Sequence, residues 1–134
     1  MRLSEIDPTS ALKSLLVDNG VTTTIYTGNK PTSGLPNEYI ELLQNGGTQT
    51  DIIRMGRVTG FVLISVNVKH LSTGGRNTVK EKIVIQSFDE LFADMKAVEK
   101  NGYIFQLEPN NLVYSGGGIY EGYSTRLINL TFRK

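Results

Sequence analysis

The chain has 134 residues, a formal net charge of +1 and no cysteine. This length suits one domain with a real hydrophobic core, and the absence of cysteine excludes disulfide bonds and thiolate metal sites. The nearly neutral charge excludes a global attraction to nucleic acid or anionic membranes. No apolar run approaches the roughly 20 residues that span a bilayer, and the start lacks the apolar core of a signal peptide. We expect a single domain over residues 1–134, cytosolic when made and without a membrane partner.

The first predicted element is a helix that follows Asp7. The Asp7 side chain can cap the helix, and Pro8 suits its first position, where a missing N–H costs nothing. An apolar stripe at helical spacing follows, made of Ala11, Leu12, Leu15 and Leu16. The sequence "DNG" at 18–20 predicts the end of the helix, because glycine favours the residue after a helix.

Strands are predicted next. Residues 21–27 are rich in β-branched side chains, which favour a strand, and residues 28–38 read as a loop punctuated by prolines. Residues 39–53 carry a hairpin pattern, since Asn45-Gly46 suits a type I′ turn.

The clearest strand covers residues 57–70. One of its faces is entirely apolar, with Val62, Ile64, Val66 and Val68, and is expected to be buried. The other face carries Phe61, Leu63, Ser65, Asn67 and Lys69. Because this second face becomes polar toward its end, we expect it to emerge into solvent or an interface.

The stretch "HLSTGGRNTVKEK", residues 70–82, has two glycines, three basic residues (Arg76, Lys80 and Lys82) and the single histidine of the chain. It matches neither the P-loop pattern nor the dinucleotide-binding glycine pattern. We interpret it as a turn from a strand into a helical segment. His70 has no nucleophile and no orienting partner in the pattern, so a structural or surface role is favoured over catalysis.

A second helix is predicted after this turn, on a stripe of Val84, Phe88, Leu91, Met95 and Val98. Its start has two interpretations. Asn77 could cap a long helix, or Ser87 could cap a shorter helix that follows a strand "KIVIQ". The "KNG" at 100–102 is expected to end either helix. The acidic residues Asp89, Glu90 and Asp94 lie on the polar face and are expected to be solvated, close to the helix start in the second interpretation.

The tail reads as three further strands, at 103–108, 112–114 and 123–132, with a break at the glycine run "SGGG". The tyrosines and glycines of 114–124 suggest a bulged loop with a protein-contact role. The predicted fold is therefore α+β, one mixed and mainly antiparallel sheet with two helices packed on it, in the order α-β-β-β-α-β-β-β.

Charge is unevenly distributed along the chain. The segment 54–82 holds one acidic residue, Glu81, against Arg54, Arg57, Lys69, Arg76, Lys80 and Lys82. The segment 83–125 is acidic, with Lys96 and Lys100 against Asp89, Glu90, Asp94, Glu99, Glu108 and Glu121. If the two regions lie on opposite sides, identical copies could pair positive against negative around a ring. The six basic residues are our candidates for contact with another subunit or with DNA.

The order of "ALKSLLVDNG", "TIYTGNKP", "LPNEYIELL", "GFVLISVNVKHL", a long amphipathic helix, "NGYIFQLEP" and "YSTRLINLTF" resembles the tail terminator or tail-completion family of tailed bacteriophages. The resemblance covers nearly the whole chain and favours the helix start near Asn77. It implies a structural protein without a catalytic site, which forms a ring, commonly a hexamer, at the head-tail junction of the virion. Its partners would be the tail-tube protein, the head-tail connector and DNA that passes without sequence specificity. Assembly would take place in the bacterial host cytoplasm.

The alternative function is a small nucleic-acid-binding or protein-binding module that uses the basic 54–82 segment. An enzyme has the weakest support, because the sequence lacks cysteine, has one histidine and shows no clustered acid–base set. We predict no catalytic residue, no metal site and no cofactor.

Overall fold

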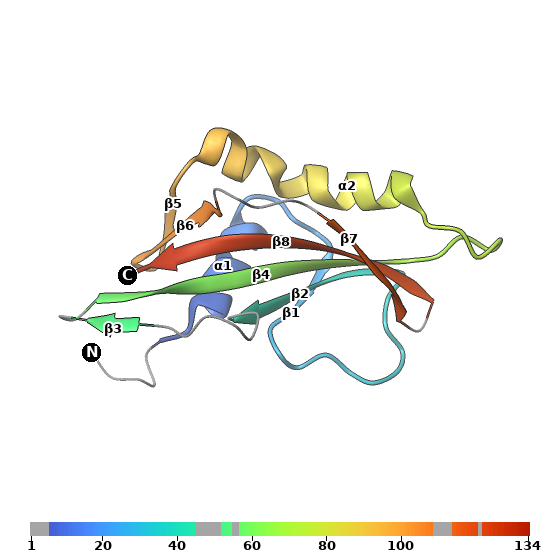
Figure 1. Cartoon of the computed structure of the whole chain (residues 1–134), viewed down its shortest axis with the longest axis horizontal. Coiled ribbons are helices and arrows are strands. Elements are labelled where there is room, and N and C mark those ends of the chain that lie inside the picture. The colour runs from blue at the N-terminus through green and yellow to red at the C-terminus, as the bar shows by residue number, and fades with distance from the viewer. Residues whose placement is uncertain (1–5, 45–51, 55–56, 109–113, 121) are drawn as a thin grey trace.

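Helices and groups of strands alternate along the chain in the computed structural model. The structure describes residues 6–44, 52–54, 57–108, 114–120 and 122–134, and only the backbone at 52–54 and 114–120. The elements are α1 (Pro8–Asp18), β1 (Thr24–Tyr26), β2 (Glu38–Gln44), β3 (Ile52–Arg54), β4 (Arg57–Lys69), α2 (Thr78–Asp89), the 3-10 helix η2 (Glu90–Met95), β5 (Val98–Lys100), β6 (Tyr103–Leu107), β7 (Tyr114–Tyr120) and β8 (Tyr123–Arg133) (Figure 1). The predicted α+β class is confirmed, and the short strands β3 and β5 are added to the predicted order.

One sheet contains all the strands of the described residues. Its order is β1-β2-β4-β8-β6-β5, with β3 paired to β4 and β7 paired to β8. The β1–β2 pair is parallel and the other pairs are antiparallel. The long strands β4 and β8 pair along nearly their whole lengths, from Thr59 opposite Arg133 to Lys69 opposite Tyr123. The long axis of the molecule therefore follows these two strands (Figure 1).

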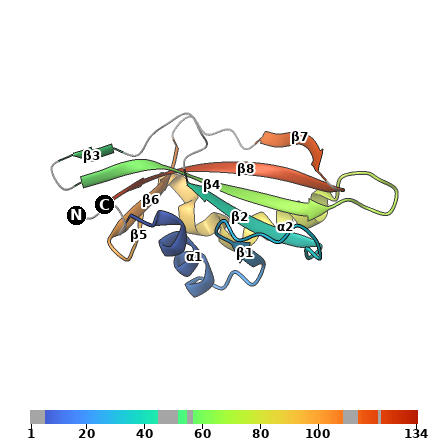
Figure 2. The same ribbon diagram turned by 90° about the horizontal axis from the view of Figure 1, so that it is seen from below.

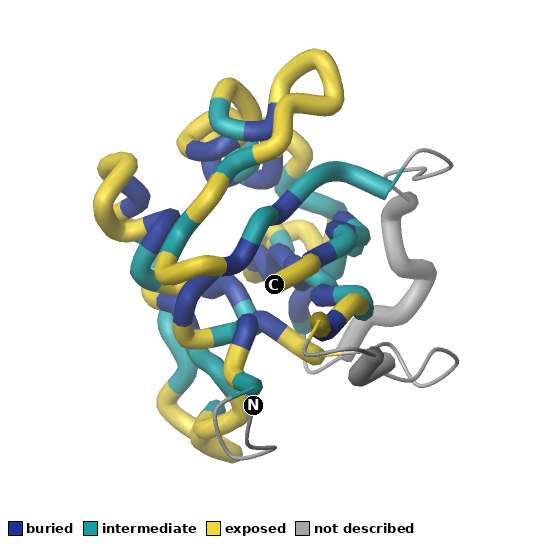
Figure 3. The backbone as a smooth tube through the Cα atoms, turned by 90° about the vertical axis from the view of Figure 1, so that its left-hand side faces the viewer, coloured by how far each residue is buried: buried dark blue, intermediate teal, exposed yellow. Residues whose placement is uncertain are grey.

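Both α-helices cover the same face of the sheet (Figure 2). The apolar face of β4 is buried as predicted, with Val62, Ile64 and Val66 fully buried. The stripe of α1 and the residues Val84 and Phe88 of α2 join these β4 residues in one core. Figure 3 shows buried segments of the backbone (dark blue) in the interior and exposed loops (yellow) at the periphery. Burial of each such side chain contributes about 1.5–3 kcal/mol, which makes this core the main stabilising element of the fold.

The opposite face of β4 is less exposed than predicted. Ser65 and Asn67 are only 5% and 6% exposed, whereas Lys69 is exposed. Asn67 Nδ2 donates to the Ser65 carbonyl at 3.2 Å, and Thr125 Oγ1 on the neighbouring strand donates to Asn67 Oδ1 at 2.6 Å. Because these polar groups satisfy one another, they can be buried on a face that their sequence alone assigns to solvent.

The first helix begins as predicted. Asp7 is its N-cap, Pro8 is its first residue, and Asp7 Oδ1 accepts a hydrogen bond from the Ser10 N–H at 3.2 Å. Hydrogen bonds from Ser10, partly opposed by desolvation, lower the pKa of the Asp7 carboxyl below its ordinary value. The Asp7 N–H donates to the Tyr103 hydroxyl at 2.8 Å, so the start of α1 is tied to β6.

The second helix begins at the earlier of the two predicted positions. The Asn77 side chain accepts from the Lys80 N–H at 3.1 Å and caps α2, so the Ser87-capped helix after a strand "KIVIQ" is wrong. Ser87 lies inside the helix and its hydroxyl donates to the Val84 carbonyl. Val79 and Ile83, which fall off the apolar stripe, are simply exposed on the outer side of the helix, at 69% and 52%.

The end of the second helix differs from the prediction. α2 ends at Asp89, η2 ends at Met95, and Val98 lies in β5. Asp94 and Met95 have φ angles of 56° and 60°, which turn the chain back toward the sheet. The acidic residues Asp89, Glu90 and Asp94 are exposed as predicted, but they lie at the end of α2 and in η2, not near the helix start.

The "KNG" sequence is a hairpin turn and not a helix stop. Lys100 of β5 lies opposite Tyr103 of β6, and the two residues between them have φ angles of 53° and 84°. Positive φ at both central positions is what a type I′ turn requires, and Asn-Gly supplies it at low cost. None of the helices among the described residues is long and apolar enough to cross a membrane.

Two other predicted connections are also wrong. β2 and β3 do not form a hairpin with each other, because both pair antiparallel with β4 on the edge opposite β8. The predicted turn at Asn45-Gly46 lies outside the described residues. The glycine run does not break the tail, since it lies within β7, whose register with β8 shifts between Gly116 and Tyr120.

Candidate functional site: the basic start of α2

The turn from β4 into α2 is an ordinary strand-to-helix turn, as predicted. The Leu71 N–H donates to the Gly75 carbonyl at 2.9 Å, and Gly74 has a φ of 87° that a larger residue would adopt only with strain. His70 Nδ1 lies 3.0 Å from the Gly74 carbonyl, so this histidine closes the turn. Within the described part of the chain, no group of three or more His, Cys, Asp or Glu residues could hold a metal ion.

The structure divides the six predicted contact residues between two places. Four of them surround the start of α2, namely Lys69, Arg76, Lys80 and Lys82. Arg57 is exposed at the other end of β4, about 40 Å away along a strand that rises roughly 3.3 Å per residue. Arg54 lies opposite Arg57 in β3, and its side chain is outside the described residues. The segment 54–82 therefore does not form one basic patch.

A second basic cluster surrounds Arg57. The exposed Arg133 pairs with Thr59 across β4 and β8, and the backbone of Lys134 exchanges hydrogen bonds with Val58. The Lys134 ammonium lies 4.6 Å from the centroid of the Tyr103 ring. The basic groups thus lie at both ends of the long strands.

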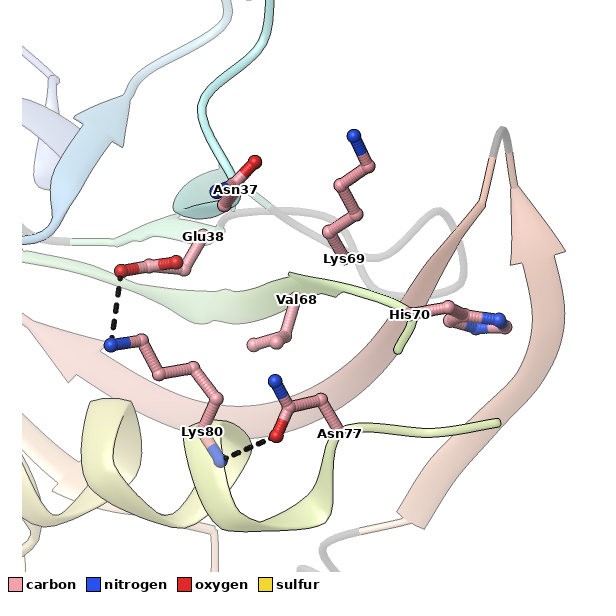
Figure 4. Close-up of a pocket in the computed structure, with 7 residues that line it drawn as sticks. All are labelled: Asn37, Glu38, Val68, Lys69, His70, Asn77 and Lys80. Atoms are coloured by element: carbon pink, nitrogen blue, oxygen red, sulfur yellow. Dashed lines mark hydrogen bonds and ion pairs between the residues drawn. The ribbon is translucent and has the colours of Figure 1, made fainter. Parts of the chain in front are cut away.

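On one side of the α2 start there is an open pocket of about 260 Å³ (Figure 4). Lys80 Nζ points toward Glu38 and lies 3.5 Å from its Oε1, whereas Lys69 points away from the helix. This pair is partly exposed, so it contributes little stability, and one of the predicted cations is already partnered within the chain.

On the other side of the α2 start there is a smaller pocket of about 190 Å³, lined by Arg76, Thr78, Glu81, Lys82 and Arg126. We call it the Arg126 pocket. Glu81 is only 1% exposed, and its Oε1 lies 2.6 Å from Arg76 Nη2 and 3.8 Å from Arg126 Nε. Three cationic side chains surround one buried carboxylate, so the Arg126 pocket has an excess of positive charge.

Sequence reasoning missed Arg126 and the structural role of Glu81. In both cases the sequence places a charged residue on an otherwise apolar face of a helix or strand. Glu81 lies one turn before Val84 on the buried stripe of α2, and Arg126 shares a strand face with Ile128 and Leu130. A charged residue on an otherwise apolar face usually has a charged partner, and here the two residues are partners of each other.

The two ends of α2 carry opposite charge. Cations flank its start, while its last turn has no basic residue and is followed by the exposed Glu90 and Asp94. The helix dipole leaves a partial negative charge at the end of a helix, so carboxylates there are destabilised. The arrangement does not stabilise α2 within the monomer, and an external cation or basic surface would relieve it.

Comparison with known proteins gives the fold alone. No protein-family model matches this chain, and no curated protein matches it in sequence. One solved structure, of a protein without a functional name, is similar with a TM-score of 0.54 over 92% of this chain and 87% of that chain. Because only 11% of the residues are identical, this likeness supports the architecture and carries no function.

Proposed function

We propose that this protein is a structural subunit of a tailed bacteriophage or prophage, and that copies of it associate head to tail into a ring at the head-tail junction. The ring would end tail-tube growth and join the tail to the head. It would meet the tail-tube protein on one side and the head-tail connector on the other, with DNA passing through its channel. No catalytic step is part of this proposal.

The observation that carries the proposal is the separation of charge along α2. Its 12 residues span about 18 Å. Five cations lie around its start, against the carboxylates of Glu38 and Glu81. Three carboxylates lie at its end and in η2, and Figure 1 shows that the two ends point in opposite directions along the molecule. The basic surface at the start of α2 and the acidic surface at its end are complementary in charge and lie on opposite sides of one subunit. This arrangement favours head-to-tail contacts between identical copies.

The resemblance to the tail terminator family supports the same function. The resemblance favours a helix start near Asn77, and α2 is capped by Asn77. The nucleic-acid alternative receives less support, because the six predicted basic residues are divided between two ends. In addition, Arg76 and Lys80 already have carboxylate partners within the chain. An acidic protein surface at the start of α2 therefore explains the charge pattern better than one nucleic-acid groove.

The test is the size of the assembly, measured by light scattering over a range of protein concentrations with and without purified tail-tube protein. We expect a discrete oligomer. Lys82→Glu and Glu90→Lys should each weaken it, because each places like charges across the contact. The combination of the two should restore assembly, since every copy then regains an opposite pair.

A matched control is Lys13→Glu, which makes the same charge change on the exposed side of α1. This control should leave assembly unchanged. A chain that stays monomeric under all of these conditions, with and without tail-tube protein, would overturn the ring. An oligomer that ignores all three α2 variants would keep the ring but remove α2 from its contact.

A further inference from the structure

The Arg126 pocket contains buried polar atoms that lack a hydrogen-bond partner. Among the described side chains, Arg76 Nε, Arg126 Nε and Glu81 Oε2 are buried and make no hydrogen bond. The first two are donors and the third is an acceptor. Since buried polar groups in folded proteins are nearly always hydrogen-bonded, an occupant of the Arg126 pocket would supply at least one acceptor and one donor.

The charge of the Arg126 pocket indicates an anion. One arginine is enough to neutralise Glu81, and here Arg76, Arg126 and Lys82 surround it. Thr78 is the first residue of α2 and also lines the pocket. The first backbone N–H groups of a helix have no partner inside the helix and favour anions. Of these groups, the Asn77 side chain accepts a hydrogen bond from the Lys80 N–H.

Glu81 restricts which anion fits. Its carboxylate is 1% exposed and offers an acceptor, so an anion that is fully ionised would be repelled. Sulfate at neutral pH has no hydrogen to donate. A phosphate group that retains one proton has an O–H for Glu81 Oε2 and oxygens for the two arginines.

We propose that the Arg126 pocket binds a protonated phosphate group, either as inorganic phosphate or as a terminal phosphate monoester. A phosphate monoester has its second pKa near 6, so a fraction of it keeps this proton at neutral pH. The phosphodiesters of a nucleic-acid backbone have no such proton and are disfavoured. Phosphate binding does not require ring formation, because each monomer contains all the residues of the site.

The test is calorimetric titration of the full chain at pH 7 with inorganic phosphate and, at equal ionic strength, with sulfate. We expect phosphate to bind at least about tenfold more tightly than sulfate. Arg126→Gln should weaken phosphate binding by about tenfold or more, because it removes a charged donor. Arg133→Gln, the same change at an exposed position of the same strand, should leave binding unchanged.

Glu81→Gln tests the selectivity directly. Its amide can donate to an anion, so sulfate binding should rise and the preference for phosphate should fall toward unity. If circular dichroism shows that this variant is unfolded, Lys82→Gln tests the site instead. Lys82 is exposed at the rim of the pocket, and loss of its charge should weaken phosphate binding. The wild-type ratio of phosphate to sulfate affinity decides in either case.

Dinucleotides with a 5′-phosphate or a 5′-hydroxyl distinguish the two sources of the group. Binding of the 5′-phosphorylated form alone assigns the pocket to a nucleic-acid end or a nucleotide, and binding of inorganic phosphate alone assigns it to the free ion. Either result supports the site. Equal affinity for sulfate and phosphate, or no phosphate binding up to about 10 mM, would overturn it.

Discussion

Replacement of Glu81 by glutamine should destabilise the protein by about 3 kcal/mol. Glu81 is 1% exposed and its Oε1 lies 2.6 Å from Arg76 Nη2. Removal of one partner of a buried ion pair typically costs about 3–5 kcal/mol, because the other charge stays unpaired. The Arg76 and Arg126 side chains are 35% and 30% exposed, so water can partly replace the carboxylate and the lower end of that range applies.

Urea unfolding followed by circular dichroism measures this loss, and the melting temperature should fall by about 10 °C for a chain of this size. A double-mutant cycle of Glu81→Gln with Arg76→Gln isolates the pair and should show a coupling above about 1 kcal/mol. Glu90→Gln, at an exposed carboxylate, is the matched control and should change stability by less than about 0.5 kcal/mol. A loss at Glu81 no larger than at Glu90 would refute a buried, paired carboxylate.

Three further variants test the fold. Asp7→Ala should cost about 1 kcal/mol at pH 7 as the cap of α1 is lost. The pKa of Asp7 is lowered in the folded protein, so the stabilisation from its carboxylate is fully present above the pKa of the unfolded chain, 3.8. It is lost as the pH falls through the pKa of the folded protein. The free energies of unfolding of the wild type and the Asp7→Ala variant should therefore converge in acid. Phe88→Ala should cost about 3–5 kcal/mol in urea unfolding because Phe88 is 3% exposed in the core. Gly102→Ala should cost about 1–2 kcal/mol in thermal unfolding, since residue 102 has a φ of 84° in the β5–β6 turn; an unchanged melting temperature would contradict this turn.

The carboxylates at the C-terminal end of α2 lower the stability of the helix, and the proposed contact with a basic surface would offset that cost. Carboxylates at a helix end each cost roughly 0.3–1 kcal/mol at low salt. Selection for monomer stability alone would favour a basic residue at Asp89 or Glu90, and the chain has none in the last turn of α2. An interface with a basic surface would turn this cost into a favourable interaction.

Local patterns predicted several elements well. The period-two alternation of β4 identified both the strand and its buried face, because that face is apolar at every position. Asp7 and Pro8 located the start of α1 because capping depends on neighbouring residues only. The same physics failed at "KNG", because an Asn-Gly pair suits both a helix end and a hairpin turn, and only the pairing of β5 with β6 distinguishes them.

Long-range burial explains the remaining errors. The predicted helical stripe continued to Val98, but the chain leaves the helix after Asp89 so that β5 and β6 can return to the sheet and bury Phe105 against Phe132. Ser65 and Asn67 appeared to belong to a solvent-facing surface. They are buried because Thr125, far away in sequence, satisfies the amide of Asn67.

The sequence by itself determined the α+β class, the central strand, the cap of α1 and the excess of basic residues in 54–82. Each of these depends on residues that are neighbours along the chain or on simple composition. Only the tertiary structure decided that the basic residues divide between two ends, and that Arg126 of β8 meets Glu81 of α2. A charge pair of this kind forms because the core packs α2 across the sheet, and no local spacing specifies which strand residue the helix will cover.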